Sequence, residues 1–81
     1  MKEPRTIWTA DFPLSEDVVK EVTYCLRSGV PVRIGAACTG HTRAAMVERY
    51  SLAFFHDLGA REVKIPYKYM PDFTETYYLM D

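Results

Sequence analysis

The pattern of apolar and polar positions in the first third of the chain predicts a strand followed by a helix. β-Branched and aromatic residues dominate positions 6–9, which favours a short strand, and the segment Asp11-Phe12-Pro13-Leu14 ends it. Ser15 is suited to cap a helix, because its hydroxyl can accept a hydrogen bond from a free backbone N–H. Apolar residues then recur at helical spacing as far as Arg27, and Ser28-Gly29 stops the helix. The residues of this apolar face are Val18, Val19, Val22, Cys25 and Leu26.

The middle of the chain predicts a buried strand, a tight loop and a second helix. Residues 30–37 form an apolar run with several β-branched side chains, which is typical of a central strand. Residues 38–42 are small or polar and predict a loop. A second helix is expected from about Arg43 to Leu58, with Gly59 at its end. Its apolar face consists of Met46, Val47, Tyr50, Ala53, Phe54 and Leu58.

The last quarter of the chain is harder to assign. Val63, Ile65 and Tyr67 alternate with charged or proline positions, which favours a strand, although a helix stays open for residues 60–67. From Pro71 onward, a short helix is one interpretation. The order is β-α-β-α with an open end, and a strand–helix–strand unit favours parallel pairing. We therefore expect one α/β domain over residues 1–81, with a short parallel sheet in a small three-layer-like arrangement.

Composition and charge narrow the classes of function. The chain has 81 residues, 48% of them hydrophobic, and a formal net charge of −1, which argues against a module that binds nucleic acid by neutralising its phosphates. Its two cysteines, Cys25 and Cys38, cannot make a disulfide framework, so reduced thiols in the cytoplasm are expected. No apolar run approaches the roughly 20 residues of a membrane helix. We expect neither a nucleic-acid nor a membrane partner.

The predicted loop between the second strand and the second helix carries the candidate chemistry. Such turns point several backbone N–H groups at one place, and the helix dipole adds to their positive potential. Gly40 would allow the close or left-handed backbone of an anion cradle. Arg43 is unusual, because a cation in the first helical turn opposes the dipole by about 0.3–1 kcal/mol. A bound anion would make the position of Arg43 favourable, because the guanidinium could pair with it. The alternative is an empty loop with Arg43 lying along the surface.

Three stretches resemble the Cys-based protein tyrosine and dual-specificity phosphatases. The segment Ala37-Cys38-Thr39-Gly40-His41-Thr42-Arg43 matches the family's C-x-x-G-x-x-R loop at the glycine and the arginine, with alanine in the cysteine place. Trp8-Thr9-Ala10-Asp11-Phe12 resembles the W-P-D loop, one residue longer. The segment from Tyr69 to Thr76 is similar to a Y-x-P-x-x-x-E-T stretch of small bacterial and phage-encoded members.

The resemblance implies roles only at matching positions. Arg43 and the amides of residues 37–43 would hold phosphoryl oxygens, and Asp11 would be the general acid. The family's nucleophile falls at Ala37, which has no atom able to attack phosphorus, and its usual hydroxyl after the arginine falls at Ala44. An engineered cysteine-to-alanine change would explain Ala37 alone, whereas natural loss of catalysis explains both. The expected protein is a phosphate- or phosphoester-binding pseudophosphatase.

A second alignment keeps an active enzyme as an alternative. The segment Cys38-Thr39-Gly40-His41-Thr42-Arg43 resembles the C-T-G-N-x-x-R-S loop of low-molecular-weight phosphatases with one residue deleted. Cys38 would then be the nucleophile, because a helix N-terminus and an arginine favour the thiolate. The deletion shortens the cradle by one amide, and an error of about 1 Å can lower a rate about 100-fold. The alternative role of Cys38 is that of a small loop residue.

The remaining candidates have simpler interpretations. His41 could donate to a ligand, or be merely solvated, and His56 suits the negative end of its helix. Asp11 could be no more than a turn residue. The histidines and cysteines lack metal-ligand spacing, so we expect no metal site, and no cofactor is implied.

The C-terminal tail is rich in tyrosine. One interpretation is that these residues cover a thin core, and the other is that they form a surface for a protein partner or a homodimer. The chain would then be a small α/β interaction module with an empty loop. The tyrosines are Tyr67, Tyr69, Tyr77 and Tyr78, accompanied by Met70 and Phe73.

Overall fold

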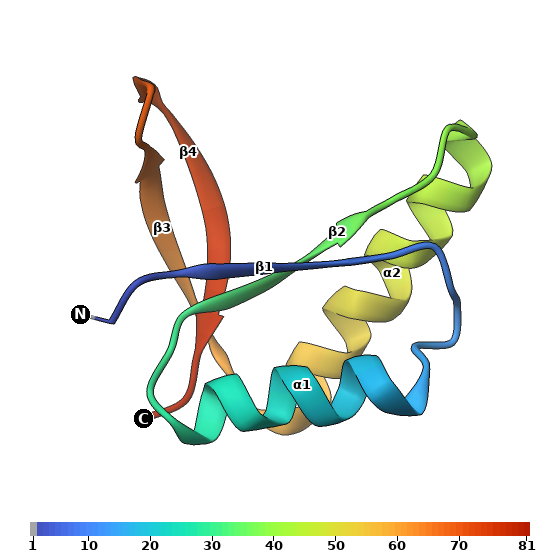
Figure 1. Cartoon of the computed structure of the whole chain (residues 1–81), viewed down its shortest axis with the longest axis horizontal. Helices are drawn as coiled ribbons and strands as arrows, with labels where there is room; N and C mark the ends of the chain where they lie inside the picture. Colours follow the sequence, from blue (N-terminus) through green and yellow to red (C-terminus); the bar gives the residue numbers. More distant parts are fainter. Residues whose placement is uncertain (1) are drawn as a thin grey trace.

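The computed structural model describes residues 2–81, which form two helices and four strands (Figure 1). In chain order the elements are β1 (Arg5–Thr9), α1 (Glu16–Arg27), β2 (Val32–Ala36), α2 (His41–Leu58), β3 (Arg61–Tyr67) and β4 (Met70–Leu79). The expected α/β class is confirmed, and Met1 of the expected domain lies outside the described residues. Neither helix of the described part combines the length and apolar content needed to cross a membrane.

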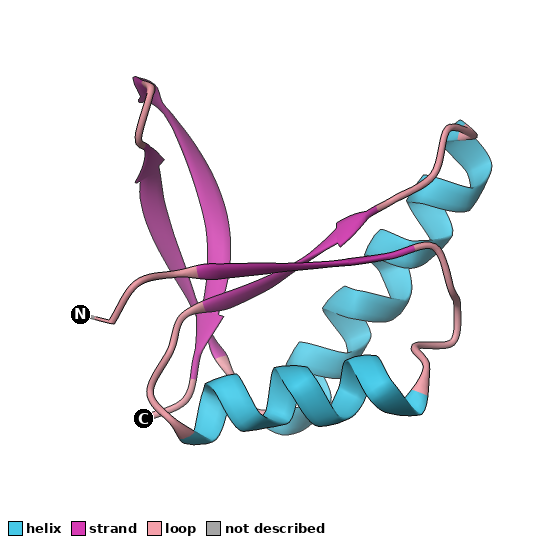
Figure 2. Cartoon of the chain, viewed as in Figure 1, coloured by secondary structure: helices cyan, strands magenta, loops and turns pink. Residues whose placement is uncertain are grey.

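The strands form one mixed sheet in the order β1-β2-β4-β3. β1 and β2 are parallel, with Ile7 opposite Ile34, whereas β4 runs antiparallel to both of its neighbours. Both helices lie on the same face of the sheet (Figure 2), so the arrangement has two layers rather than the three-layer-like form expected. The reason is that the residues after α2 form a hairpin, which leaves no helix within residues 2–81 to cover the other face.

The hairpin of β3 and β4 replaces the short helix that was one interpretation for the segment after Pro71. That interpretation is wrong, because each residue from Thr74 to Leu79 lies opposite a residue of β3. The strand favoured for residues 63–67 is confirmed and begins at Arg61. β4 meets β2 at one pair only, Val32 opposite Tyr78, and beyond it the hairpin turns away from β2 and projects from the rest of the domain (Figure 1).

The ends of α1 follow from its sequence. The Ser15 hydroxyl accepts a hydrogen bond from the amide of Val18 at 3.3 Å, and Glu16 and Asp17 stand in the first turn, where negative charge suits the helix dipole. At the other end Gly29 adopts a φ of +74°, a left-handed conformation that glycine tolerates best. The predicted cap and stop of this helix are confirmed.

Replacing Ser15 by alanine is expected to lower the free energy of unfolding by about 1 kcal/mol, since it leaves one amide of the first turn without an acceptor. Chemical denaturation followed by circular dichroism measures this. Ser15→Asp is the control, because its carboxylate accepts the same bond; an equal loss in both variants would contradict the capping role.

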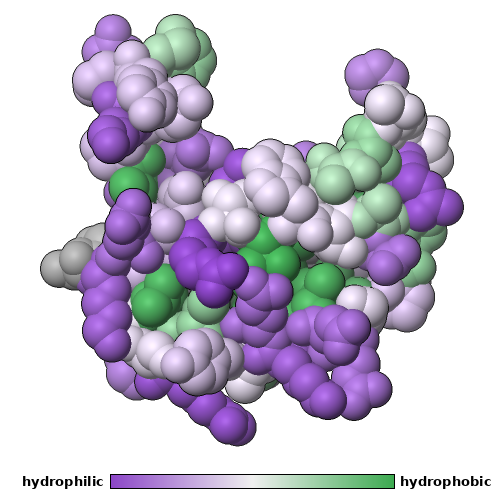
Figure 3. Space-filling model, in the orientation of Figure 1, coloured by the Kyte–Doolittle hydropathy of each residue, from purple (hydrophilic) through white to green (hydrophobic). Residues whose placement is uncertain are grey.

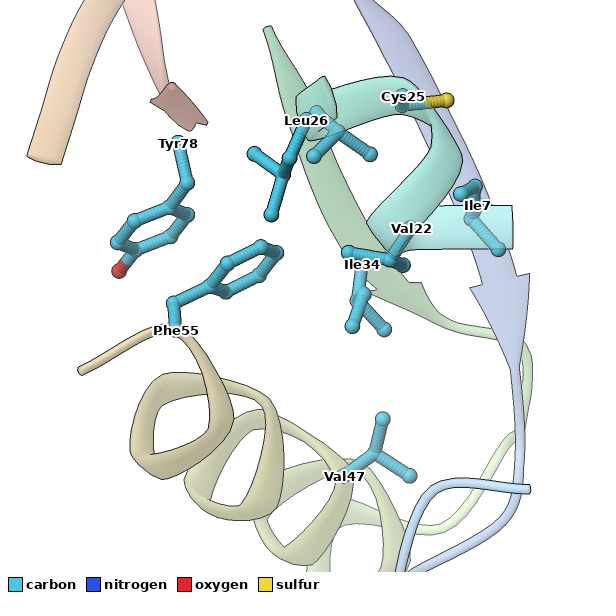
Figure 4. Close-up of a cluster of buried hydrophobic side chains, with 9 residues drawn as sticks. Ile7, Val22, Cys25, Leu26, Ile34, Val47, Phe55 and Tyr78 are labelled. Carbon is cyan, nitrogen blue, oxygen red and sulfur yellow. The ribbon is translucent and has the colours of Figure 1, made fainter. Parts of the chain in front are cut away.

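The core lies between the sheet and the two helices (Figure 4). It contains an aromatic pair, in which the rings of Phe55 and Tyr78 stack with centroids 4.1 Å apart and planes 7° apart. Phe55 is 1% exposed and Tyr78 8%. The interpretation of the tail as core cover therefore holds for Tyr78. The expectation that it forms part of a contact surface for a partner is wrong, since its ring is already occupied by Phe55. The other buried members of the core are Ile7, Val22, Cys25, Leu26, Val32, Ile34 and Val47.

Burial, together with the charge of Glu62, raises the pKa of the Tyr78 hydroxyl above its ordinary value of 10.0. The folded chain therefore holds this proton more tightly than the unfolded chain. The stabilisation is complete below pH 10 and is lost as the pH rises through the folded pKa. We expect Tyr78→Phe, which keeps the ring, to reduce the alkaline loss of stability in denaturation curves from pH 8 to 12. Tyr24→Phe, on the exposed face of α1, is the control. If stability falls with pH as steeply in Tyr78→Phe as in Tyr24→Phe, this expectation is contradicted.

Candidate functional site

The candidate site lies where the parallel strands β1 and β2 end. Their carboxyl ends meet at one edge of the sheet, the usual place for ligands in α/β proteins. The connections that leave this edge are residues 10–15 and residues 37–40 (Figure 1). The amide of Ala37 donates to the carbonyl of Thr9 at 2.8 Å, which extends the strand pairing into the loop and holds the two connections together.

Six consecutive amides, those of Cys38 to Arg43, have no hydrogen-bond acceptor within residues 2–81. They precede and begin α2, which starts at His41, two residues earlier than expected. The helix has 18 residues, no side-chain cap at Gly40 and no acidic residue in its first turn. Its positive end is therefore uncompensated, unlike that of α1.

Of the close or left-handed backbone that was expected at Gly40, the left-handed form is not adopted. Its φ is −86° and its ψ is 136°, an extended conformation open to any residue. A Cβ atom at this position would meet nothing within 4 Å. The glycine therefore leaves the approach to the amides free of a side chain, and that is its observable contribution to the loop.

Arg43 bridges the two connections. Its Nη1 donates to the carbonyl of Ala10 at 2.6 Å, and its guanidinium lies 5.0 Å from the centre of the Phe12 ring. These partners offset the unfavourable position of a cation in the first helical turn. Its side chain is exposed and only one of its five N–H donors has a partner within residues 2–81, so the others remain available to a ligand.

The first connection is fixed by Phe12, whose ring packs against Tyr50 of α2 with centroids 5.9 Å apart. Asp11 is exposed, and its amide donates to the Thr9 hydroxyl at 3.2 Å. Its carboxylate has no partner within residues 2–81, and its chain neighbour Ala10 holds Arg43. The W-P-D-like and C-x-x-G-x-x-R-like stretches therefore meet in space. The roles of Ala10 and Phe12 had no distinguishing signal in the sequence.

The other predicted site residues fall into two groups. Thr39, His41 and Thr42 are exposed around the loop, and Cys38 is a partly exposed free thiol. His56 lies in the last turn of α2, at the opposite end of the helix from the loop. No three His, Cys, Asp or Glu side chains among the described residues are grouped so that they could hold a metal ion. Cys25 is buried in the core.

Comparison with protein-family models, with curated proteins and with solved structures finds no match for this chain. The class is therefore stated from the structure itself: a two-layer α/β protein with an uncapped strand-to-helix loop at the edge of a parallel strand pair.

Proposed function

We propose that this protein binds a phosphate or phosphoester group at the carboxyl ends of β1 and β2. The observation that carries the proposal is the run of six amides without acceptors, from Cys38 to Arg43, at the uncapped start of an 18-residue helix. Backbone donors and the helix dipole both favour an anion there. Arg43 adds N–H donors suited to phosphate from the same turn, and the resemblance of residues 37–43 to a phosphate loop supports the same ligand.

Titration with inorganic phosphate, followed by NMR of the backbone amides, tests this proposal. We expect the signals of residues 38–43 to shift in a saturable way at constant ionic strength. The start of α1 is the internal control, because Ser15 already occupies one of its amides and acidic residues stand in its first turn. Equal shifts at both helix starts, or none at residues 38–43, would overturn the proposal.

We propose that binding occurs without turnover. Ala37 stands in the place of the family's nucleophile, and its side chain offers no atom to attack phosphorus. Ala44 likewise has no hydroxyl to assist. Asp11 is exposed at the same edge, but a general acid is of no use without a leaving group to protonate.

Cys38 provides the alternative, an active phosphatase, because it is a free thiol at the same loop. Hydrolysis of an aryl phosphate by the purified protein, abolished in Cys38→Ser but kept in Cys25→Ser, would support that alternative. We expect no hydrolysis above the rate in buffer. Free thiols at both positions agree with a cytoplasmic location, which is part of the proposal.

A further inference from the structure

One face of the sheet has no helix over it within residues 2–81, and exposed apolar side chains of β1, β3 and β4 lie on it among polar ones. We call it the open face and define it by Trp8, Arg33, Ile65, Tyr67, Met70 and Phe73, which line a hollow of about 760 Å³ together with several polar and charged residues. Trp8 is 61% exposed and Phe73 60%. Trp8 lies so close over β2 that a Cβ atom at Gly35 would stand 2.5 Å from its ring, and Arg33 lies 5.4 Å from the ring centre.

The projecting hairpin has its apolar side on this face. Ile65 lies opposite Glu75 and Val63 opposite Tyr77, so these residues share one side of the hairpin. The other side is polar beyond Tyr78, with Lys64 hydrogen-bonded to Thr76. An isolated two-stranded hairpin is only marginally stable in water, so an apolar side without cover calls for a partner. The hairpin and the start of α2 project from the surface with a hollow between them (Figure 3).

The exposed apolar area matches what a dimer needs. Trp8, Tyr67, Met70 and Phe73 are each between 43% and 61% exposed. With about 150–250 Å² for a large side chain, they offer roughly 320–540 Å² of largely apolar surface. A standard interface buries about 800 Å² per partner, of which about 60% is apolar, or roughly 480 Å².

The charges of this face suit a second copy better than a strongly charged ligand. Arg33 and Glu75 neutralise each other at 3.0 Å. At the rim, Glu3 and Lys68 have opposite signs and no ion pair within residues 2–81. If the Lys68 of one copy meets the Glu3 of the other, two-fold symmetry makes the same contact a second time, as a self-complementary interface requires. A nucleic acid would gain little from a face with balanced charges.

We propose that two copies of this chain form a two-fold dimer through their open faces, with the hairpin of each copy against the sheet of the other. This interface differs from the surface that was expected from the tyrosine-rich tail. It keeps Tyr67, Met70 and Phe73 and adds Trp8, while Tyr77 and Tyr78 are 9% and 8% exposed and belong to the buried residues. It is separate from the loop at residues 37–43, so it does not rest on the proposed anion site.

Sedimentation equilibrium and the fluorescence of Trp8, the only tryptophan, test the dimer. We expect a particle of about twice the 9.4 kDa mass of the chain, with Trp8 emission moving to shorter wavelength as the protein concentration rises. Phe73→Ser should raise the dissociation constant about 30-fold, as expected when an aromatic residue buried in an interface is lost. Tyr24→Ser, at an aromatic residue of α1 that is 71% exposed, is the matched control and should stay dimeric.

Circular dichroism establishes that both variants are folded. A protein that stays at 9.4 kDa at every concentration up to ~1 mM would overturn the proposal. A dimer with an ordinary dissociation constant, which is well below ~1 mM, would have formed at that concentration. A dimer weakened equally by Phe73→Ser and Tyr24→Ser would also overturn the proposal. A monomer whose Trp8 emission responds only to an added oligonucleotide or to an unrelated protein would assign the face to that other partner and overturn the second-copy assignment.

Discussion

Replacing Phe55 by alanine is expected to lower the free energy of unfolding by about 3–5 kcal/mol. The ring is 1% exposed and stacks on Tyr78, and this contact joins α2 to the hairpin. Removal of the ring leaves a cavity between α2 and the hairpin. The hairpin then loses one of its few attachments to the domain, because β4 pairs with β2 at one position only. At about 0.05–0.15 kcal/mol per residue, a chain of 81 residues has a total stability of roughly 4–12 kcal/mol.

The variant is therefore expected to be largely unfolded near 37 °C, which thermal and chemical denaturation will show. Leu52→Ala is the matched control on the same helix, since its side chain is 43% exposed, and we expect a loss of about 0.5 kcal/mol or less. Similar losses for both variants would mean that the Phe55–Tyr78 stack does not hold the hairpin to the domain.

Replacing Arg43 by glutamine is expected to weaken the binding of inorganic phosphate about 10- to 100-fold. The estimate follows from about 1.5–3 kcal/mol for hydrogen bonds to a charged group. The amides of residues 38–42 remain, so weak binding should persist. Arg43→Lys keeps the positive charge but not the planar guanidinium, so its affinity for phosphate should lie between those of the wild type and Arg43→Gln. Isothermal titration calorimetry at fixed salt measures all three affinities.

Arg49→Gln removes the same charge from an exposed position further along α2 and should leave the affinity nearly unchanged. Because Arg43 also bonds the Ala10 carbonyl, the melting temperature of each variant is needed beside its affinity. If Arg43→Gln binds phosphate as well as the wild type does, the guanidinium serves only to join the two connections. The proposed site would then consist of amides alone.

The two proposals concern different parts of the molecule and can fail separately. The anion site uses the edge of the sheet where β1 and β2 end, while the dimer uses the face opposite the helices. Phe73→Ser should therefore leave phosphate binding intact, and Arg43→Gln should leave the dimer intact. A dimer lost in Arg43→Gln would show that the two regions are coupled.

Much of the fold could be predicted from local sequence. Helix α1 was predicted from Ser15 to Arg27 because its cap, its apolar spacing and its glycine stop all act within one segment. The end of α2 at Gly59 followed from the same local rule, and there the glycine does adopt a left-handed φ of 74°. The tail was not predictable in this way, because β4 is a strand only through its pairing with β3.

The candidate site, too, has a part that local sequence predicts and a part that it does not. The run from Cys38 to Arg43 was identified from its position between a strand and a helix, and the structure leaves its amides without acceptors within residues 2–81. The partners of Arg43 are 33 residues away in the chain, at Ala10, and at Phe12. No local pattern links such positions, because the link exists only once β1 and β2 lie side by side.

By itself, the sequence determined where α1 starts and stops, where α2 ends and which loop offers free amides, since capping, spacing and backbone freedom act over a few residues. Only the tertiary structure decided that Tyr78 is core while Trp8 and Phe73 are surface, and that Arg43 reaches across to the connection that follows β1. The physical reason is that burial depends on which strand lies beside which. In this domain a hairpin took the place of a helix and left one face of the sheet uncovered.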